Sequence, residues 1–420
     1  MRLLYDLLLV LYHASIKLAA WTGNEKARLW VNGRKDWQHH LRHALKDKPG
    51  KRIWFHCSSL GEFEQGRPLM EKLAGQDPTL VIVLTFYSPS GFEVRRNFSG
   101  AGIVAYLPPD SRKNARQFLD IVSPAMTVFV KYEFWYHYFQ EHSKRRIPLY
   151  VVSAHFRKNQ VFFRWYGGFF RRILECVSHF FVQDSESVRL LQSIGFKNAS
   201  VSGDTRFDRV ISVRDRHPSL PLLEEFSRGN RLLVAGSTWP EDEELLYQVM
   251  NQRSIVNLKL VLAPHEISSS RIQDILKNAR RFFEEKDIAL YSNGKTAGAK
   301  ILVMDNMGLL SSAYAYGTIA WVGGGFGKGI HNILEAAVYG RPVIFGPAWK
   351  RFREARELIE CGGAYSVSNK SEAESIVRKM FEEEQFLKKS SEASKSYVNS
   401  QAGSTERILQ FFSKAPGPKI

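Results

Sequence analysis

The chain has 420 residues, which is enough for two domains with separate cores. Its formal net charge of +17 is spread along the sequence and favours an anionic partner, such as a phosphorylated substrate, an acidic membrane surface or nucleic acid. The three cysteines are far apart, so they exclude a disulfide framework and a zinc motif and indicate a reducing compartment.

The N-terminal stretch, residues 3–21, is mostly apolar and almost long enough to cross a bilayer, but Asp6, His13 and Lys17 interrupt it. No small-residue cleavage site follows, so the stretch is not typical of a removable signal peptide. Basic residues come next and are expected to hold the following chain on the cytoplasmic side. We predict a membrane anchor helix over residues 1–30, which either spans the bilayer or lies on it; a helix packed on the protein is the alternative.

From residue 52 onward, short β-branched runs alternate with helical stretches, which is typical of a parallel sheet covered by helices. The first runs are residues 52–56, 80–86, 103–107, 126–130, 149–152 and 179–182. The later runs are residues 231–235, 258–263, 300–304, 318–322 and 342–345.

Between these two groups of runs, residues 212–230 contain prolines, a glycine and many charges, and they predict a linker. We therefore predict an α/β fold with two Rossmann-like domains, residues 31–211 and 231–420. Ligands are expected at a cleft between the carboxyl ends of the two sets of strands.

A glycine-rich stretch follows the run at 318–322. Its five glycines between 323 and 329 precede a helix expected over 333–339, which suits a phosphate or nucleotide cradle. The spacing matches neither the dinucleotide-binding fingerprint nor a Walker loop. Asn332 and Glu335 either form a capping box or bind a nucleotide, with the carboxylate accepting hydrogen bonds from ribose hydroxyls.

In the first domain, two carboxylates follow predicted strands. Glu62 is expected at a strand-to-helix turn, where it acts as a general base or only complements the helix dipole. Glu133 lies among aromatic residues, and burial would raise its pKa unless Lys131 or another cation pairs with it. His56 is expected to be a structural residue at the end of its strand.

Other candidates are individually weaker. Arg206 either holds phosphate or forms a salt bridge with Asp204 or Asp208. In the second domain, residues 263–266 follow a strand and are candidate anion contacts, and the backbone of residues 305–309 is a candidate reader of a base edge.

Together these motifs resemble the Kdo transferase family, glycosyltransferases that move 3-deoxy-manno-octulosonic acid (Kdo) from CMP-Kdo onto lipid A precursors. The motifs are H-C-S-S-L-G-E at 56–62, T-F-Y-S-P-S-G at 85–91, Y-L-P-P-D at 106–110, Y-E-F-W at 132–135, S-G-D-T-R-F-D at 202–208, G-S-T-W-P-E-D-E-E at 236–244 and G-I-H-N-I-L-E at 329–335. Their order and spacing over nearly the whole chain make the resemblance specific.

The resemblance implies a GT-B architecture with the acceptor on the N-terminal domain, the CMP-sugar donor on the C-terminal domain, and no metal or other cofactor. It implies that Glu62 is the general base and that Glu133 and Arg206 stabilise the transition state. The CMP contacts that it implies are Pro264, His265, Met307, Gly308, Leu309, Asn332, Ile333, Leu334 and Glu335.

The implied activity is inverting transfer of Kdo from CMP-Kdo to a lipid A precursor (lipid IVA) in lipopolysaccharide core biosynthesis, on the cytoplasmic side of the bacterial inner membrane. Its partners would be these two substrates and an anionic membrane surface. The chain departs from the family pattern at three places: His265 follows Pro264 directly where the family commonly has Arg-His, Leu309 replaces a common Glu, and F-W-Y-H at 134–137 replaces L-W-P-N.

Two alternatives remain open at this stage. One is a GT-B transferase or epimerase that uses a UDP-sugar. The other is a basic nucleic-acid-binding protein, which rests on the net charge alone because no zinc spacing or clustered basic stripe supports it. Nucleic acid is therefore not expected as a partner.

Overall fold

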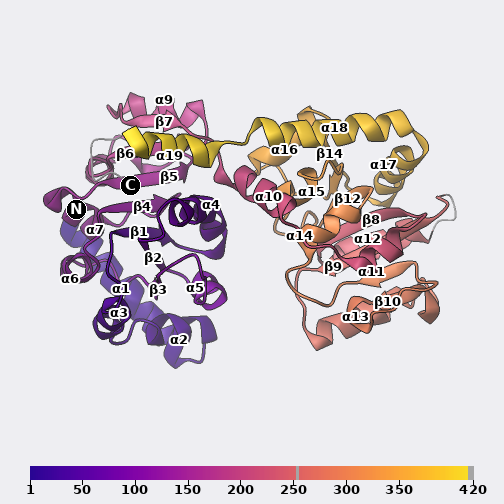
Figure 1. The fold of residues 1–420 in the computed structure, drawn as a ribbon, viewed down its shortest axis with the longest axis horizontal. Coiled ribbons are helices and arrows are strands. Elements are labelled where there is room, and N and C mark those ends of the chain that lie inside the picture. The colour runs from indigo at the N-terminus through magenta and orange to yellow at the C-terminus, as the bar shows by residue number, and fades with distance from the viewer. Residues whose placement is uncertain (252–254, 415–420) are drawn as a thin grey trace. The chain divides into compact units, whose positions relative to one another are not determined.

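The computed structural model describes residues 1–251 and 255–414, which form two α/β units (Figure 1). The first unit contains Met1–Arg209 together with residues 402–414, and the second contains Val210–Gln401. Each has a parallel sheet of seven strands among the described residues, with helices packed against it. The predicted α/β fold with two Rossmann-like domains is therefore confirmed.

The first sheet has the strand order β3-β2-β1-β4-β5-β6-β7. Its strands are β1 (Arg52–Cys57), β2 (Val81–Phe86), β3 (Ile103–Tyr106), β4 (Met126–Val130), β5 (Leu149–Ala154), β6 (His179–Val182) and β7 (Ala199–Val201). The helices of this unit are α1 (Arg2–Trp21), α2 (Glu25–Asn32), α3 (Trp37–Leu45), α4 (Leu60–Gln76), α5 (Pro89–Arg95), α6 (Arg112–Val122), α7 (Tyr136–Arg145), η1 (Val161–Phe163), α8 (Gly168–Leu174), α9 (Ser185–Ser193) and α19 (Ser404–Lys414).

Side chains of β1 show why this sheet is buried on both faces. Trp54 lies in one hydrophobic core, whereas Ile53 and Phe55 lie in the other, as the alternation of side chains along a strand requires. Continuous apolar runs of this kind are typical of parallel strands that are covered on both faces.

The second sheet has the order β10-β11-β9-β8-β12-β13-β14. Its strands are β8 (Arg231–Thr238), β9 (Leu258–Pro264), β10 (Ile288–Leu290), β11 (Ile301–Val303), β12 (Ile319–Val322), β13 (Val343–Phe345) and β14 (Ala364–Ser366). The helices are α10 (Thr205–Asp215), which continues from the first unit, α11 (Pro221–Ser227), α12 (Pro240–Met250), α13 (Ser269–Ala279), η2 (Glu285–Asp287), η3 (Tyr291–Asn293), α14 (Leu310–Ala313), η4 (Tyr314–Tyr316), α15 (Leu334–Ala337), α16 (Arg353–Glu360), α17 (Lys370–Glu382) and α18 (Glu384–Ser400).

Every predicted strand is present, with its ends shifted by a few residues at most. The three strands that the sequence did not predict, β7, β10 and β14, have three residues each. Such segments are too short to show a period in the sequence, and pairing with a neighbouring strand defines them.

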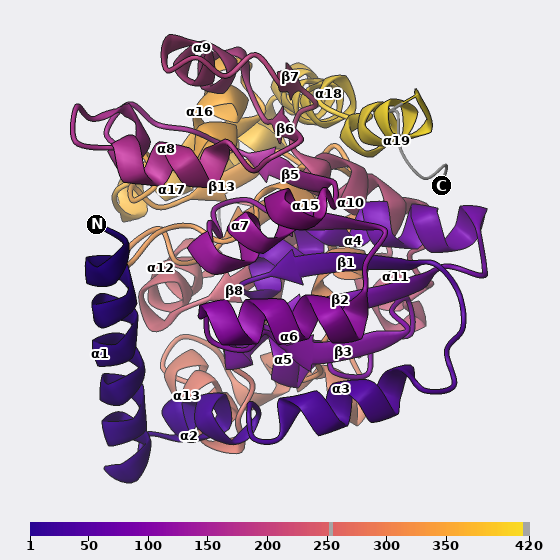
Figure 2. The same ribbon diagram turned by 90° about the vertical axis from the view of Figure 1, so that its left-hand side faces the viewer.

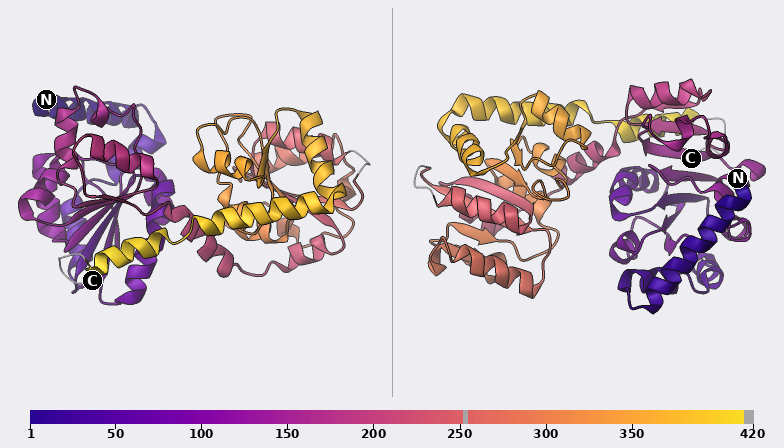
Figure 3. Two further views of the ribbon diagram at one scale, coloured as in Figure 1. Left: turned by 90° about the horizontal axis from the view of Figure 1, so that it is seen from above. Right: turned by 180° about the vertical axis from the view of Figure 1, so that it is seen from behind.

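The C-terminal segment differs from our expectation that residues 231–420 form one domain; residues 252–254 and 415–420 of that range lie outside the described part. Helix α19 packs on the first unit, where Ile408, Leu409 and Phe412 are buried (Figure 3). The Asp208 carboxylate accepts hydrogen bonds from the N–H groups of Gly403 and Thr405, both at 2.6 Å. The chain therefore returns to its first unit after Gln401.

The expected linker, residues 212–230, is largely helical. It contains the end of α10 and all of α11. Leu223 and Phe226 of α11 are buried, and the N–H of Leu220 donates to the Tyr316 hydroxyl at 2.8 Å. Because these contacts lie within the second unit, most of the expected linker is part of that unit.

The predicted anchor helix over residues 1–30 consists of two helices, because Asn24 accepts a hydrogen bond from the N–H of Ala27 and caps α2. Helix α1 is long and apolar enough to cross a membrane by length and composition. It runs along the first unit (Figure 2). Arg34, one of the basic residues expected near the membrane, is instead buried and donates to the backbone carbonyls of Trp30, Tyr87 and Leu107.

Candidate active site

The order of the first sheet reverses between β1 and β4, which lie side by side and lead to neighbours on opposite sides. In open parallel sheets, ligands bind beyond the carboxyl ends of the strands at such a reversal. Glu62 follows β1 by five residues, and Glu133 follows β4 by three. The structure therefore brings both candidate carboxylates to the reversal point of one sheet.

Glu62 lies in the first turn of α4, where the sequence predicted a strand-to-helix turn. Its side chain is mostly buried, and its carboxylate accepts a hydrogen bond from the backbone N–H of Ser58. Burial, followed by the negative charge of Glu133, raises the pKa of Glu62 to about 7, although the Ser58 N–H and the Lys131 charge oppose this shift. A carboxyl with such a pKa exchanges protons readily near neutral pH, as a general base must.

Glu133 is partly exposed, and its Oε2 lies 3.9 Å from Nε2 of the fully buried His56. The first residue after β4 has an unusual backbone: Lys131 has a φ of +64°, in the left-handed region that non-glycine residues rarely adopt. Its N–H donates to the Val152 carbonyl at 3.0 Å. The strain turns the chain sharply at the carboxyl end of β4, a property that often accompanies functional sites.

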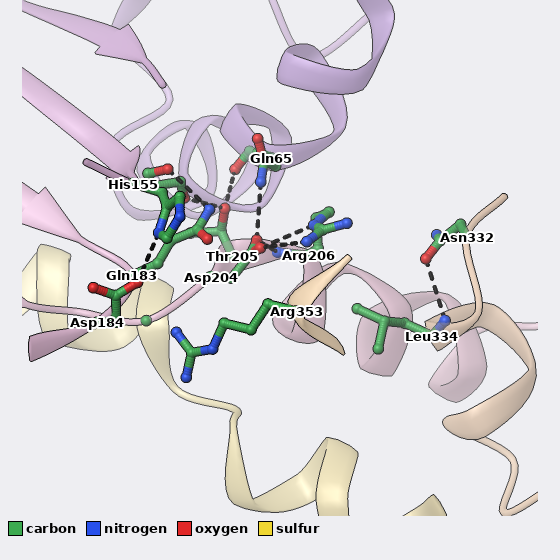
Figure 4. A network of polar contacts seen from close by, with 12 residues as sticks. Gln65, His155, Gln183, Asp184, Asp204, Thr205, Arg206, Asn332, Leu334 and Arg353 are labelled. Atoms are coloured by element: carbon green, nitrogen blue, oxygen red, sulfur yellow. Dashed lines mark hydrogen bonds and ion pairs between the residues drawn. The ribbon is translucent and has the colours of Figure 1, made fainter. Parts of the chain in front are cut away.

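Arg206 forms a salt bridge with Asp204, one of the two roles predicted for it from the sequence. Its guanidinium Nη2 lies 2.8 Å from Oδ2 of the buried Asp204. Asp204 Oδ1 also accepts from Nε2 of Gln65, at 3.0 Å, and the Thr205 hydroxyl donates to the Gln65 carbonyl at 2.6 Å (Figure 4). Because Gln65 lies on α4, these contacts hold Arg206 relative to the helix that carries Glu62.

The positive charge of Lys131 acts on two carboxylates, those of Glu62 and Asp204. Its positive charge lowers the pKa of Glu62 against the opposing effects of burial and Glu133. At Asp204, burial raises the pKa, but the charges of Arg206 and then of Lys131 outweigh it and bring the pKa below its usual value. The sequence suggested Lys131 only as a partner of Glu133, since no local pattern reveals that it lies near carboxylates from three separate segments.

The second unit gathers the three candidate donor-binding segments at the carboxyl ends of its strands. Pro264 ends β9, and the N–H of His265 donates to the Thr238 carbonyl at the end of β8, at 3.0 Å. The His265 ring stacks on His331, with centroids 4.3 Å apart, and His331 directly precedes Asn332. The segments at 264–265 and 331–335 are therefore neighbours.

The third segment, Met307 to Leu309, precedes α14. Ser311 of α14 donates from its hydroxyl to Oε2 of Glu335 at 2.6 Å, which ties this segment to the start of α15. Met307 is 85% exposed, and Gly308 has a φ of +86°. The backbone of this segment is therefore accessible, as contact with a nucleobase requires.

Asn332 and Glu335 contact each other but do not form the capping box that was one of the two predictions, because α15 has Ile333 as its N-cap and no side-chain capping hydrogen bond. Asn332 Nδ2 donates to Glu335 Oε1 at 2.9 Å, and Asn332 Oδ1 accepts from the N–H of Leu334 at 3.2 Å. The helix that they begin, α15, covers only four residues instead of the expected 333–339. Ile333 and Leu334 are buried in the core, so neither side chain is available to a ligand.

The glycine stretch also differs from the expected cradle of unshielded amides. The N–H groups of Gly323, Gly324, Gly327 and Gly329 donate to acceptors within the unit. A Cβ on Gly325 would lie 2.5 Å from the backbone nitrogen of Gly346. Gly323, Gly324 and Gly325 are therefore needed for close packing of backbone segments, and the sequence alone did not separate this role from phosphate binding.

Asp242 binds the start of the glycine stretch, and the sequence analysis did not identify it. This fully buried carboxylate accepts from the N–H of Gly324 at 2.9 Å, the N–H of Trp239 at 3.0 Å and the indole N–H of Trp321 at 3.2 Å. Burial raises its pKa, and these three hydrogen bonds oppose the rise. The signal available in the sequence was its place four residues after the end of a strand, where a helix-capping carboxylate is common.

Comparison with solved structures identifies the fold. The fold resembles a UDP-GlcNAc 2-epimerase from Neisseria meningitidis, with a TM-score of 0.61, 12% identity, and coverage of 87% of this chain and 100% of that chain. It also resembles MurG from Acinetobacter baumannii, with a TM-score of 0.55, 10% identity, and coverage of 87% and 100%. The chain has the GT-B fold of glycosyltransferases and related epimerases.

Comparison of sequences points to a more specific group of proteins than comparison of structures. Residues 35–209 match the family described as 3-deoxy-D-manno-octulosonic-acid transferase (kdotransferase). The 3-deoxy-D-manno-octulosonic acid transferase of Aquifex aeolicus is 26% identical over 335 residues, which are 78% of this chain and 85% of that protein. The enzyme of the same name from Haemophilus influenzae is 24% identical over 375 residues, 86% of each. The chain is similar to Kdo transferases over most of its length, and the resemblance inferred from its motifs is confirmed.

Proposed function

We propose that this protein is an inverting glycosyltransferase that moves Kdo from CMP-Kdo to a sugar hydroxyl of a lipid A precursor in lipopolysaccharide biosynthesis. The observation that carries the proposal is the Glu62 carboxyl, with its pKa of about 7, beside Glu133 at the reversal point of the first sheet. The family relationship supplies the substrates.

In the proposed reaction, Glu62 takes the proton of the acceptor hydroxyl while that oxygen forms a bond to the anomeric carbon of Kdo. The bond from this carbon to the phosphate oxygen breaks, and CMP leaves with its electron pair. Glu133 keeps the pKa of Glu62 high through its negative charge. The role of Arg206 in stabilising charge in the transition state is part of the proposal, supported by the rigid mounting of its guanidinium on Asp204.

The second unit is assigned the donor. The residues 264–265, 307–309 and 332–335 would hold CMP, with the Glu335 carboxylate as the acceptor for ribose hydroxyls. Since most amides of the glycine stretch are engaged, we assign the phosphate charge to nearby cations. Lys328 is exposed within the stretch, and the Arg351 guanidinium donates to the Lys328 carbonyl.

We further propose that α1 lies flat in the surface of an anionic membrane rather than spanning it. Two of its polar side chains face the protein: the Tyr5 hydroxyl donates to Asp110 at 2.7 Å, and Asp6 pairs with His137 at 2.6 Å. The opposite side exposes the apolar side chains Leu3, Leu4, Leu7, Leu8, Val10, Leu11 and Leu18. A helix bound to its domain along one side while exposing leucines on the other is suited to the membrane interface.

An aromatic turn supports this orientation. Trp165 is 92% exposed, and Tyr166 is exposed beside it, in the loop that leads into α8. Phe169 of α8 packs on Tyr5 of α1, with ring centroids 5.8 Å apart, so this turn lies near the N-terminal end of α1 (Figure 2). Tryptophan and tyrosine favour the level of the lipid headgroups.

The test is transfer from CMP-Kdo, generated in situ, onto a tetra-acylated lipid A precursor with EDTA present, read by mass spectrometry. A mass increase of one or more Kdo units supports donor, acceptor and metal independence together. Competition of CMP and UDP for the protein is measured alongside, and a preference for UDP would favour a UDP-sugar enzyme. CMP binding without product would contradict the proposed acceptor, and absence of CMP binding would contradict the proposed donor site.

A further inference from the structure

His56 is a fully buried histidine beneath the candidate carboxylates, and the proposed reaction does not yet use it. It ends β1 together with Cys57, and its ring lies between Thr85 of β2 and Glu133 beyond β4. Among the described residues its Nε2 has no hydrogen-bond partner, and the carboxylate oxygen of Glu133 lies 3.9 Å away. A buried polar atom without a partner costs free energy, so its retention calls for a role.

Hydrogen bonding at Thr85 determines which ring nitrogen carries the proton. The indole N–H of Trp54 is only a donor, so the Thr85 hydroxyl oxygen accepts from it, at 2.7 Å. The single hydroxyl proton of Thr85 can go to Nδ1 of His56, at 2.9 Å, or to the carbonyl of Phe55, at 3.3 Å, and the shorter distance favours Nδ1. Nδ1 is therefore an acceptor, and in the neutral ring the proton resides on Nε2.

The ring is neutral near physiological pH because burial lowers the pKa of His56, and the charge of Arg34 acts in the same direction. The Glu133 carboxylate and the contact with Thr85 oppose the shift. A neutral His56 with its proton on Nε2 presents an N–H group toward Glu133. A small rotation of the Glu133 side chain, by about 1 Å at the oxygen, brings that oxygen within hydrogen-bond distance of about 2.9 Å.

We infer that His56 is a positioning residue that holds the Glu133 carboxylate through its Nε2–H, with Trp54 and Thr85 fixing the tautomer. This inference rests on the proposed function of Glu62 and Glu133. Since the charge of Glu133 contributes to the raised pKa of Glu62, a Glu133 held in place keeps the general base poised near neutral pH.

Two substitutions separate this role from simple packing. His56→Gln places an amide N–H near the position of Nε2, whereas His56→Asn reaches only the position of Nδ1. We expect His56→Asn to lower kcat about tenfold or more with little change in KM and to move the pH–rate profile toward acid, because Glu62 loses part of the influence of Glu133. His56→Gln should recover most of the rate.

A double-substitution cycle tests the coupling. In a Glu133→Gln protein, His56→Asn should cause no further loss of kcat, since the group that it positions is already altered. Equal losses in the Asn and Gln variants, or full additivity with Glu133→Gln, would overturn the inference and leave a packing role. Thermal unfolding of each variant identifies any loss that arises from misfolding.

A second measurement does not depend on activity. Histidine ¹⁵N labelling with two-bond ¹H–¹⁵N spectra of the full-length protein in detergent reports the tautomer of His56, assigned by its disappearance in His56→Gln. We expect a neutral ring with the proton on Nε2 and a shifted Nε2 signal in Glu133→Gln. The opposite tautomer, or an unchanged signal, would contradict the positioning contact. If this signature is present but no Kdo transfer occurs, the proposed function fails while the contact stands.

Discussion

For the single residue Glu62, the local sequence determines its position in a helix, and the tertiary environment determines its pKa. Its place in the first turn of a helix follows from the chain itself, and a glutamate there is commonly a helix-dipole residue. Its raised pKa arises from groups that are distant in sequence, because burial of the carboxyl group and the charge of Glu133 both disfavour ionisation. The sequence position of this carboxylate is therefore common, whereas its pKa in the folded protein is not.

Glu62→Gln should abolish transfer while CMP binding persists, since the amide cannot accept the acceptor proton. In the wild-type protein, the rate should rise with pH through about 7, where the Glu62 carboxyl loses its proton. Steady-state rates between pH 5.5 and 8.5 and CMP binding by calorimetry check both expectations. Near-wild-type turnover of the variant would remove Glu62 as the base.

The same pKa predicts an effect on stability. Because the folded-state pKa of Glu62 lies above its ordinary value of 4.5, the folded protein binds the proton more tightly than the unfolded chain, and this stabilisation is lost as pH rises from 4.5 to about 7. Glu62→Gln does not titrate, so its stability relative to wild type should increase over that range, by roughly 1 to 3 kcal/mol. Denaturant unfolding at pH 5 and pH 8 measures this difference, and a constant difference would contradict the shift.

At the scale of elements, the connection between β12 and α15 depends on the neighbouring α12. Asp242 of α12 binds the Gly324 amide and the indole of Trp321, so the first turn of one helix shapes the loop after another strand. A contact between segments 80 residues apart is not visible as a local pattern. The loop conformation is therefore a tertiary property, although its glycines are plain in the sequence.

Asp242→Asn should destabilise the second unit by roughly 1 to 3 kcal/mol, because an amide replaces one of two accepting oxygens and leaves a buried N–H group unsatisfied. It should also weaken CMP binding, since the loop is no longer held. Thermal unfolding with and without CMP is the measurement. Glu241→Gln, at the exposed neighbouring position, serves as the control and should leave both properties unchanged.

Helix α1 offers a second test at this scale. Replacing Leu8 and Leu11, each 56% exposed, with serine should weaken binding to anionic vesicles about tenfold or more without lowering thermal stability. The matched control replaces Val94 and Val256, which are exposed on other elements. Vesicle co-sedimentation distinguishes the two proteins. Equal binding by both would count against α1 as the membrane contact.

At the scale of the whole molecule, the first unit is built from two separate parts of the described chain, Met1–Arg209 and residues 402–414. Helix α19 buries Ile408 and Phe412 against a core that contains Tyr150 and Phe181, with the rings of Tyr150 and Phe412 4.8 Å apart. Each such side chain contributes about 1.5 to 3 kcal/mol when it is fully buried. The last described helix therefore completes the core of the unit that carries Glu62.

Truncation after Gln401 should destabilise the first unit by several kcal/mol, on the order of two or three buried side chains, and leave the second unit intact. Scanning calorimetry should show the transition of the first unit at lower temperature, whereas the transition that CMP stabilises should be unchanged. A truncated protein that unfolds like the full chain would show that α19 contributes little to that core.

The sequence by itself determined the alternation of strands and helices, the presence of two Rossmann-like domains and the resemblance to the Kdo transferases, because apolar periodicity, glycines and ordered motifs are local properties. Only the tertiary structure decided that α19 joins the first unit, that β7, β10 and β14 exist, and that the glycine amides are largely engaged. It also raised the pKa of Glu62 and aimed His56 at Glu133. These features depend on burial and on contacts between distant segments, and such contacts leave no periodic trace in one sequence.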